Sequence, residues 1–281
     1  MDRENQFDIT NWLQAWDKEI KKWDIDPFGY YAKHPLSGCY TGKKARAVQP
    51  DCLPEPYLGD PLKKHSVIFL NLNPGPTCDN FQGLAGRYTN RVREVGYSEW
   101  AKCLPYNPVT NTIDVETVYD NKRHEGGEDF WSNRNRWINE ITGYEHGAKD
   151  PAPFCLELFP FHSDKWGSLD LEQAKGWLEE WVLKPAVCLV KDAEIPAVMC
   201  VGKSFERFFR EVMGLAPELS FSSADEHIHE NWPLKNTLHP VNRSFSKFRV
   251  LGGTFVVTWH SGGNKLPGTI FKQVCQRVIY N

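Results

Sequence analysis

Four short apolar runs mark the main elements of the chain. The runs combine β-branched and aromatic residues, are bounded by Pro, Gly or Ser, and occupy residues 67–72 (VIFLNL), 155–159 (CLELF), 197–202 (AVMCVG) and 254–259 (TFVVTW). Their apolar positions are continuous rather than alternating. Continuous apolarity is typical of strands covered on both faces, as in a parallel sheet. We therefore expect four buried strands.

Apolar residues at helical spacing predict helices around these runs. Residues 8–25 form the clearest case, with Asp8 or Thr10 as N-cap. The apolar face of this helix comprises Trp12, Leu13, Trp16, Ile20 and Trp23. Further helices are expected at 130–142, 171–190, 204–213 and 269–280. Proline lacks an amide donor and clashes with the preceding turn, so Pro185 should break the second of these.

The alternation of strands and helices predicts an α/β fold. We expect a three-layer αβα architecture with a central four-stranded, mostly parallel sheet. A single domain should span residues 1–281, with residues 1–64 forming an N-terminal helix and an irregular arm laid across it. Residues 87–129 are expected to form a large insertion. Residues 214–250 also lack clear periodicity and are expected to be long loops or insertions.

Composition and charge narrow the function classes. The chain has 281 residues, of which 41% are apolar and 25% charged, which excludes a disordered or fibrous protein. With a net charge of −3, any polyanion site must come from local clustering, and a small basic run lies at Lys43, Lys44 and Arg46. Neither a secretion signal nor a stretch of ~18–20 apolar residues is present, which predicts a cytoplasmic protein without a membrane partner.

The eight cysteines form no Cys-x-x-Cys pair. Several lie inside apolar runs, where a reduced thiol behaves as a small hydrophobe. A reducing compartment without a disulfide framework is therefore expected. We expect no metal and no cofactor, because the cysteine spacing does not suggest an iron–sulfur cluster and no other ligand cluster stands out.

Candidate chemistry gathers where the four predicted strands end. In an open parallel sheet, ligands bind at the carboxyl ends of the strands. These exits read NPGPT (73–77), PFHS (160–163), KS (203–204) and HSGGNK (260–265). Two of the four carry a histidine, and each carries small or polar residues.

These exits resemble the uracil-DNA glycosylase superfamily. The first strand ends in NLNPG (71–75), similar to the Gly-x-Asp-Pro or Gly-x-Asn-Pro-Gly of that family, and the last ends in TWHSG (258–262) before a C-terminal helix. The segment AVMCVGKSFERFF looks like the family's strand–helix unit. The outline covers residues 65–86, 130–215 and 250–281, with motif identity at about ten positions. Asn71 stands in place of the usual Gly, and Ser261 in place of Pro.

The resemblance implies hydrolysis of the bond between a base and its deoxyribose after the base is flipped out of the helix. Asn73 would orient the attacking water. His260 would donate a hydrogen bond to the departing base as negative charge develops. From the residues alone, the Asn-Pro-Gly segment is also an ordinary turn, and His260 is equally readable as a structural histidine.

The resemblance also implies a base pocket. Gly75 occupies the place of a tyrosine that blocks C5 substituents in uracil-strict members, so we expect a C5-substituted pyrimidine to be tolerated. Glu157, if it faces the pocket, would accept from the exocyclic amine of a cytosine; otherwise it points elsewhere or is salt-bridged. Phe81 or Tyr88 would stack on the base, or simply pack in the core. The remaining pocket candidates are Asn71 and His162.

The DNA contacts are expected at the last two exits. Lys203, Ser204, Ser261 and Lys265 would hold phosphates, and Leu266 would wedge into the vacated stack. The alternative for the two lysines is a solvated surface position.

The leading hypothesis is a DNA glycosylase acting on a modified or deaminated pyrimidine, such as a modified cytosine, in DNA repair or in defence against phages. Its partner would be DNA, and no obligatory protein partner is inferred. Two alternatives stay open: a catalytically silent nucleic-acid-binding module of the same fold, and an unrelated small-molecule α/β enzyme. The pI of about 6.3 fits these alternatives somewhat better.

Overall fold

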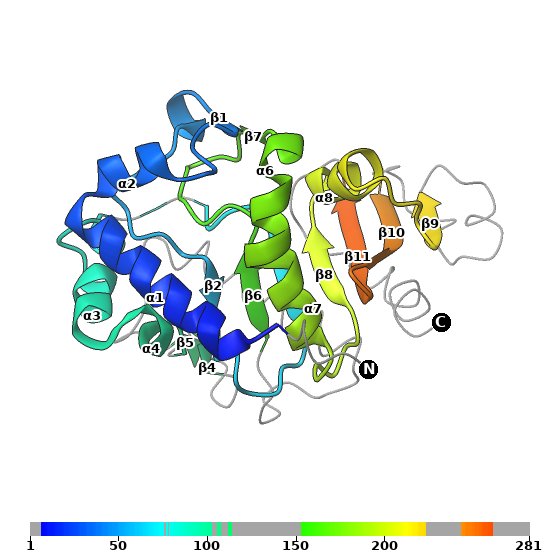
Figure 1. Ribbon diagram of the computed structural model, residues 1–281, viewed down its shortest axis with the longest axis horizontal. Helices are drawn as coiled ribbons and strands as arrows, with labels where there is room; N and C mark the ends of the chain where they lie inside the picture. Colours follow the sequence, from blue (N-terminus) through cyan, green and yellow to red (C-terminus); the bar gives the residue numbers. More distant parts are fainter. Residues whose placement is uncertain are drawn as a thin grey trace.

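The computed structural model describes residues 7–75, 77, 79–102, 106–107, 112–113, 153–222 and 243–260 (Figure 1). Its centre is a seven-stranded sheet with the order β2-β6-β3-β8-β11-β10-β9. The strands are β2 (Tyr57–Leu58), β3 (Ile68–Asn71), β6 (Phe154–Glu157), β8 (Val198–Val201), β9 (Leu219–Ser222), β10 (Arg243–Val250) and β11 (Gly253–His260). The fold is mixed α/β with a mostly parallel central sheet, which is compatible with three layers.

The four predicted strands form the parallel centre of this sheet. β3 lies between β6 and β8, and β11 follows on the other side of β8, all in parallel. Ile68 is in register with both Phe154 and Val198, and Val198 is in register with Phe255. The residues of β3, β6 and β8 are all buried, as the continuous apolar runs predicted.

Three further strands, each paired antiparallel with a neighbour, extend the parallel centre, so the prediction of four strands in the central sheet is wrong: the described sheet has seven. β2 comes from the N-terminal arm and pairs with β6, while β10 joins β11 to β9. The prediction of loops over 214–250 is therefore wrong for β9 and β10. Leu251 and Gly252 both adopt positive φ, of 49° and 83°, which suits the tight turn that folds β10 back on β11. Pairing with β11 stabilises β10. The polar residues of β10 obscure the apolar pattern that would indicate a strand.

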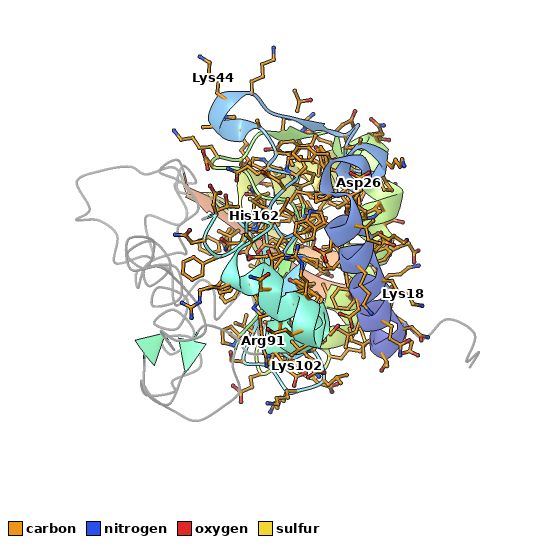
Figure 2. All side chains as sticks on the ribbon, turned by 90° about the vertical axis from the view of Figure 1, so that its left-hand side faces the viewer. Lys18, Asp26, Lys44, Arg91, Lys102 and His162 are labelled. Carbon is orange, nitrogen blue, oxygen red and sulfur yellow. The ribbon has the colours of Figure 1, made fainter. Side chains whose placement is uncertain are left out.

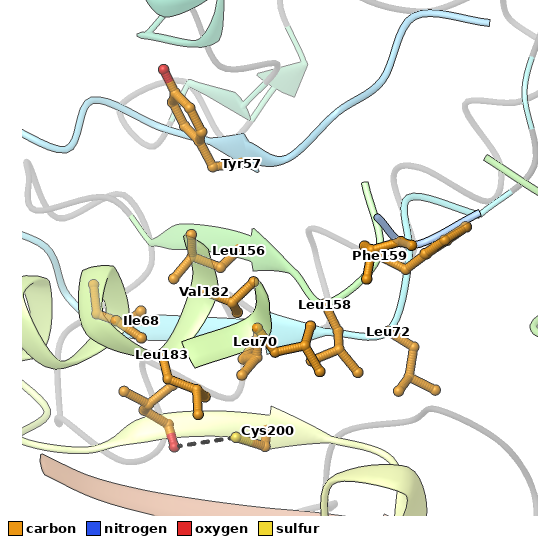
Figure 3. Close-up of a cluster of buried hydrophobic side chains, with 14 of the residues drawn as sticks. Tyr57, Ile68, Leu70, Leu72, Leu156, Leu158, Phe159, Val182, Leu183 and Cys200 are labelled. Atoms are coloured by element: carbon orange, nitrogen blue, oxygen red, sulfur yellow. Dashed lines mark hydrogen bonds between the residues drawn. The ribbon is translucent and has the colours of Figure 1, made fainter. Parts of the chain in front are cut away.

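The helices α1 (Ile9–Ile25), α6 (Leu171–Leu178), α7 (Lys184–Val190) and α8 (Lys203–Arg207) lie along one face of the sheet in Figure 1. In the close-up of Figure 3, Val182 and Leu183 lie over Ile68 and Leu70. All four side chains are buried in one hydrophobic cluster. This cluster lies between the helices and the face of the parallel strands that carries no polar residue.

The helix predicted over 171–190 does form, but Pro185 does not break it. Between α6 and α7, residues Glu179–Leu183 form a π-helical turn, and Pro185 lies in the first turn of α7. The backbone stays right-handed helical throughout. Proline is tolerated in the first turn of a helix, and the wider π turn changes the hydrogen-bond pattern immediately before it. A second π turn, Phe208–Val212, continues α8.

The N-terminal helix confirms its prediction. The Asp8 side chain accepts hydrogen bonds from the backbone N–H groups of Thr10 and Asn11, which caps α1. The buried residues of α1 are Trp12, Leu13, Trp16, Ile20 and Trp23. The arm that follows contains α2 (Pro27–Lys33), β1 (Tyr40–Thr41) and a 3₁₀ turn, η2 (Lys44–Arg46); β1 pairs with β7 (Ser168–Leu169).

The expected insertion over 87–129 has regular structure where it is described. It contains α3 (Arg87–Val95), α4 (Tyr97–Lys102) and a short hairpin of β4 (Tyr106–Asn107) with β5 (Thr112–Ile113). The helices were missed because they are short and mostly polar; tertiary burial of a few aromatic residues such as Tyr88 and Tyr97 holds them. The helices predicted at 130–142 and 269–280 lie outside the described residues.

Within the described part of the chain, Cys39, Cys52, Cys155, Cys188 and Cys200 form no disulfide. No helix in that part is both long and apolar enough to cross a membrane.

Acid should destabilise the fold through His34, which follows α2. Its ring packs on Phe161 and Trp177, and its Nδ1 accepts from the backbone N–H of Leu36. Burial lowers the pKa of His34 from 6.5 to about 4, against the opposing effect of the Glu19 charge. The unfolded chain therefore binds this proton first, and folding stability falls as the pH drops from about 6.5 through about 4.

The expected loss over this range is on the order of 3 kcal/mol. His34→Asn keeps an acceptor for Leu36 but cannot gain charge. Urea unfolding of both proteins at pH 7, 5.5 and 4 measures the effect. The variant should lose less stability than the wild type between pH 7 and pH 4, and parallel losses would contradict the assignment to His34.

Candidate functional site

The two residues predicted to be catalytic lie at the carboxyl ends of their parallel strands, at the same end of the sheet. Ile68 of β3, Val198 of β8 and Phe255 of β11 are in register, and Asn73 and His260 each follow their registered residue by five positions. Only β8 separates β3 from β11, so the two strands run ~10 Å apart. The side chain of His260 lies outside the described residues. The carboxyl ends of β3 and β11 nevertheless bring both residues to the same end of the sheet.

The amide of Asn73 is held in a defined orientation. Its Nδ2 donates to Ser163 Oγ at 3.0 Å, and Ser163 Oγ donates to the backbone carbonyl of Lys165, also at 3.0 Å. Because the serine proton is used, its oxygen must accept, which identifies the amide atom facing it as nitrogen. Among the described residues no group donates to Asn73 Oδ1, and the side chain is half-buried. Oδ1 can therefore accept a hydrogen bond from water.

A tyrosine from the N-terminal arm supports Ser163. Tyr40 Oη lies 3.2 Å from Ser163 Oγ and also contacts the backbone carbonyl of Arg46. The backbone N–H of Gly167 donates to the same phenol oxygen. Tyr40 and Ser163 were not predicted as site residues. Ser163 directly follows a predicted one, whereas Tyr40 lies in irregular sequence that carries no signal.

Gly75 confirms the turn that the sequence indicated. Its φ is +84°, in the left-handed region that favours glycine, and a Cβ at this position would meet no atom of the described residues within 4 Å. The turn therefore leaves open space where a side chain would stand.

His162 holds the same turn from the β6 exit. It is only 1% exposed, and its Nδ1 lies 3.0 Å from the carbonyl oxygen of Gly75. A carbonyl can only accept, so Nδ1 carries the proton. Its Nε2 lies 3.7 Å from Oε1 of Glu55, which is buried in the arm. His162 and Ser163 thus clamp the turn at Gly75 and Asn73, and Glu55 is a third residue that the sequence did not indicate.

Further hydrogen bonds tie the arm to this clamp. The backbone N–H of Gln49 donates to the carbonyl of His162, and that of Glu55 donates to the carbonyl of Pro160. Thr77 Oγ1 donates to Gln49 Oε1 at 2.8 Å. The arm is therefore part of the wall around the Asn73 turn.

Two predicted pocket residues form one hydrogen-bonded unit. Asn71 and Glu157 are paired across β3 and β6, and Asn71 Nδ2 donates to Glu157 Oε1 at 2.9 Å. Both are buried. The carboxylate thus lies on the same face of the sheet as Asn71, directly before the Asn73 turn.

Thr258 adds a buried hydroxyl at the position of β11 that corresponds to Asn71 in β3. It pairs with Val201 of β8, and Val201 follows Cys200, which pairs with Leu70. Within the described residues Thr258 Oγ1 has no hydrogen-bond partner. Thr258 was not predicted as a pocket residue, because it lies inside an apolar run.

The predicted stacking residues pack within the protein. Phe81 and Tyr88 are both buried, with ring centroids 5.1 Å apart, and Tyr88 also contacts Trp100 at 5.3 Å. The Arg87 guanidinium lies 5.8 Å from the Phe81 ring centroid. The described contacts place these rings in an aromatic cluster around α3 and α4, and stacking on a base stays a prediction.

The predicted DNA contacts are described only in part. Lys203 and Ser204 begin α8 after Gly202, whose φ is 134°; Lys203 is exposed and Ser204 half-buried. The backbone N–H of Gly202 donates to the carbonyl of Thr258, which holds this exit against β11. Ser261, Lys265 and Leu266 lie outside the described residues.

In the part of the chain that the structure describes, no group of three or more His, Cys, Asp or Glu side chains could hold a metal ion. Comparison with protein-family models, curated proteins and solved structures finds no match to this chain.

Proposed function

We propose that this protein is a DNA glycosylase that releases a modified or deaminated pyrimidine from DNA. The carrying observation is the orientation of the Asn73 amide: its nitrogen is anchored on Ser163 and its oxygen is left to accept. An amide is a poor base, but it can orient a water molecule toward a sugar carbon that already carries positive charge. The geometry suits that task.

In the proposed reaction, the bond between the base nitrogen and C1′ of the sugar breaks, and its electron pair leaves with the base. Water held by Asn73 Oδ1 adds through its oxygen to C1′ and loses a proton to solvent, and the departing base anion takes up a proton from solvent, so that the products are an abasic sugar and the neutral free base. His260 donates a hydrogen bond to the base as its negative charge develops.

The proposed base carries a substituent at C5 or an exocyclic amine. The open space beside Gly75 supports the first feature, because no side chain of the described part of the chain fills it. The buried carboxylate of Glu157 supports the second, because a carboxylate accepts from amines and repels the carbonyl of uracil. Modified cytosines combine both features and occur in settings of repair and of defence against phages.

The decisive experiment incubates the protein with duplexes that contain uracil, 5-hydroxymethyluracil, 5-hydroxymethylcytosine or glucosylated cytosine. Free base is measured by chromatography, and abasic sites are measured as alkali-labile breaks. Release of at least one base supports the proposal. Binding without release indicates a silent binding module, and absence of DNA affinity even at low salt indicates a small-molecule enzyme.

His260→Ala should lower the rate of base release by ~10²–10³, because one hydrogen-bond donor to developing charge is removed. The rate is measured under single-turnover conditions on the best substrate of the panel. His239→Ala is the matched control, since it also removes an imidazole but follows none of the predicted strands. Equal rates for both variants would exclude the proposed role of His260.

A further inference from the structure

Four basic residues lie on two backbone segments that hydrogen bonds connect to the Asn73 turn. Lys43 precedes η2, and Lys44 and Arg46 are within it. The backbone N–H of Lys165 donates to the carbonyl of Ala45 at 2.7 Å, which joins the β6 exit segment to η2. All four basic side chains are exposed. In Figure 2, Lys44 projects from the top of the molecule, above His162.

The basic side chains of this cluster differ from others in the described part of the chain in their ion pairing. In the described part of the chain, Lys43, Lys44, Arg46 and Lys165 form no ion pair. The acidic residues nearest in sequence, Asp51 and Asp164, are also exposed. Several other basic side chains pair with a carboxylate on their own helix, as Lys22 does with Glu19 and Arg207 with Glu211.

Hydrogen bonds join the backbone of the cluster to the Asn73 turn. Tyr40 Oη donates to the carbonyl of Arg46 at 3.1 Å, and Ser163 Oγ donates to the carbonyl of Lys165. Ser163 Oγ accepts from the Asn73 amide, and Tyr40 Oη lies 3.2 Å from Ser163 Oγ. The backbone under the basic side chains is therefore fixed relative to Asn73 through two hydrogen bonds.

We propose that Lys43, Lys44, Arg46 and Lys165 form a phosphate-binding surface that holds the DNA backbone beside the Asn73 turn. This inference rests on the proposed function, because it takes the bound polyanion to be the substrate. The net charge of −3 provides no general attraction for DNA, so attraction has to come from a local cluster. Contacts to phosphates set the register of a protein on the duplex without reading sequence.

The test measures binding of an unmodified fluorescent duplex by anisotropy between ~50 and 200 mM salt, the range over which phosphate contacts are most evident. The surface variant carries Lys43→Gln, Arg46→Gln and Lys165→Gln. Lys44, whose φ is +56°, is left unchanged so that the backbone strain at this position is the same in every protein compared. The hydrogen bonds to Tyr40 and Ser163 use backbone carbonyls, so these substitutions keep them.

The matched control carries Lys18→Gln, Lys21→Gln and Lys191→Gln, which remove the same charge from exposed positions. In Figure 2, Lys18 lies on α1, well away from Lys44. The surface variant should bind about 10-fold more weakly. It should also lower the slope of log K against log [salt] by about 2–3, because each phosphate that a protein neutralises adds ~0.9 to that slope. The control should stay within about twofold of the wild type.

Wild-type affinity in the surface variant overturns the inference, as does an equal reduction in the control, which would mean that only bulk charge matters. Lack of DNA binding by the wild type at ~50 mM salt also overturns it. Because the duplex carries no substrate base, this result is separate from base release. Binding that depends on the surface, combined with no base release from the panel, supports the surface and refutes the glycosylase.

Discussion

Asn73→Ala should reduce the rate of base release by ~10²–10⁴, the range for loss of a group that manages the reacting proton or water. The physical reason is that the attacking water loses its fixed acceptor, while the fold keeps the turn through His162 and Gly75. Single-turnover rates on the best modified duplex measure the loss. Binding of the same duplex should change little, since phosphate contacts dominate affinity.

Ser163→Ala is the graded variant for this prediction. It leaves the Asn73 amide in place and removes the hydroxyl that accepts from it, so we expect a loss of about 5-fold, in line with one hydrogen bond of ~1 kcal/mol. Thermal unfolding checks that both variants are folded. A folded Asn73→Ala protein with wild-type rate would contradict the proposed mechanism, whatever the result for Ser163.

Trp16→Ala should destabilise the protein by about 3–5 kcal/mol, the usual cost of deleting a large buried aromatic side chain. Trp16 is 1% exposed on α1, and its ring contacts Trp12, Trp177 and Trp181. Those contacts join α1 to the α6–α7 segment, which covers the sheet. Urea unfolding at neutral pH measures the change in free energy.

Trp16→Phe is the matched variant. Within the described residues the indole Nε1 of Trp16 has no hydrogen-bond partner, so phenylalanine removes a buried polar group along with some volume. We expect its destabilisation to stay within about 1–2 kcal/mol. Equal destabilisation by both substitutions would show that ring packing is not what makes Trp16 important.

The site depends on residues from three separate parts of the chain. Asn73 comes from the first parallel strand exit, Ser163 from the second and Tyr40 from the N-terminal arm. The arm was expected to lie across the main domain, and its regular elements are indeed short. Its hydrogen bonds to the β6 exit show in addition that it buttresses the Asn73 turn.

The spacing of apolar residues predicted those helices and strands whose burial depends on that spacing. Apolar runs predicted β3, β6, β8 and β11, because a strand buried on both faces must be apolar along its length. The tryptophan spacing of α1 predicted its buried face for the same reason. The left-handed Gly75 followed from an ordinary turn motif.

The sequence by itself thus determined the parallel centre of the sheet, the face of α1 and the segments that hold Asn73 and His260. Tertiary structure alone decided that Tyr40, Glu55 and Ser163 surround the Asn73 turn, that β9 and β10 pair beside β11, and that Pro185 lies inside a continuing helix. The physical reason is that these features depend on hydrogen bonds and packing between residues far apart in the chain. Such contacts produce no periodic sequence pattern in either segment.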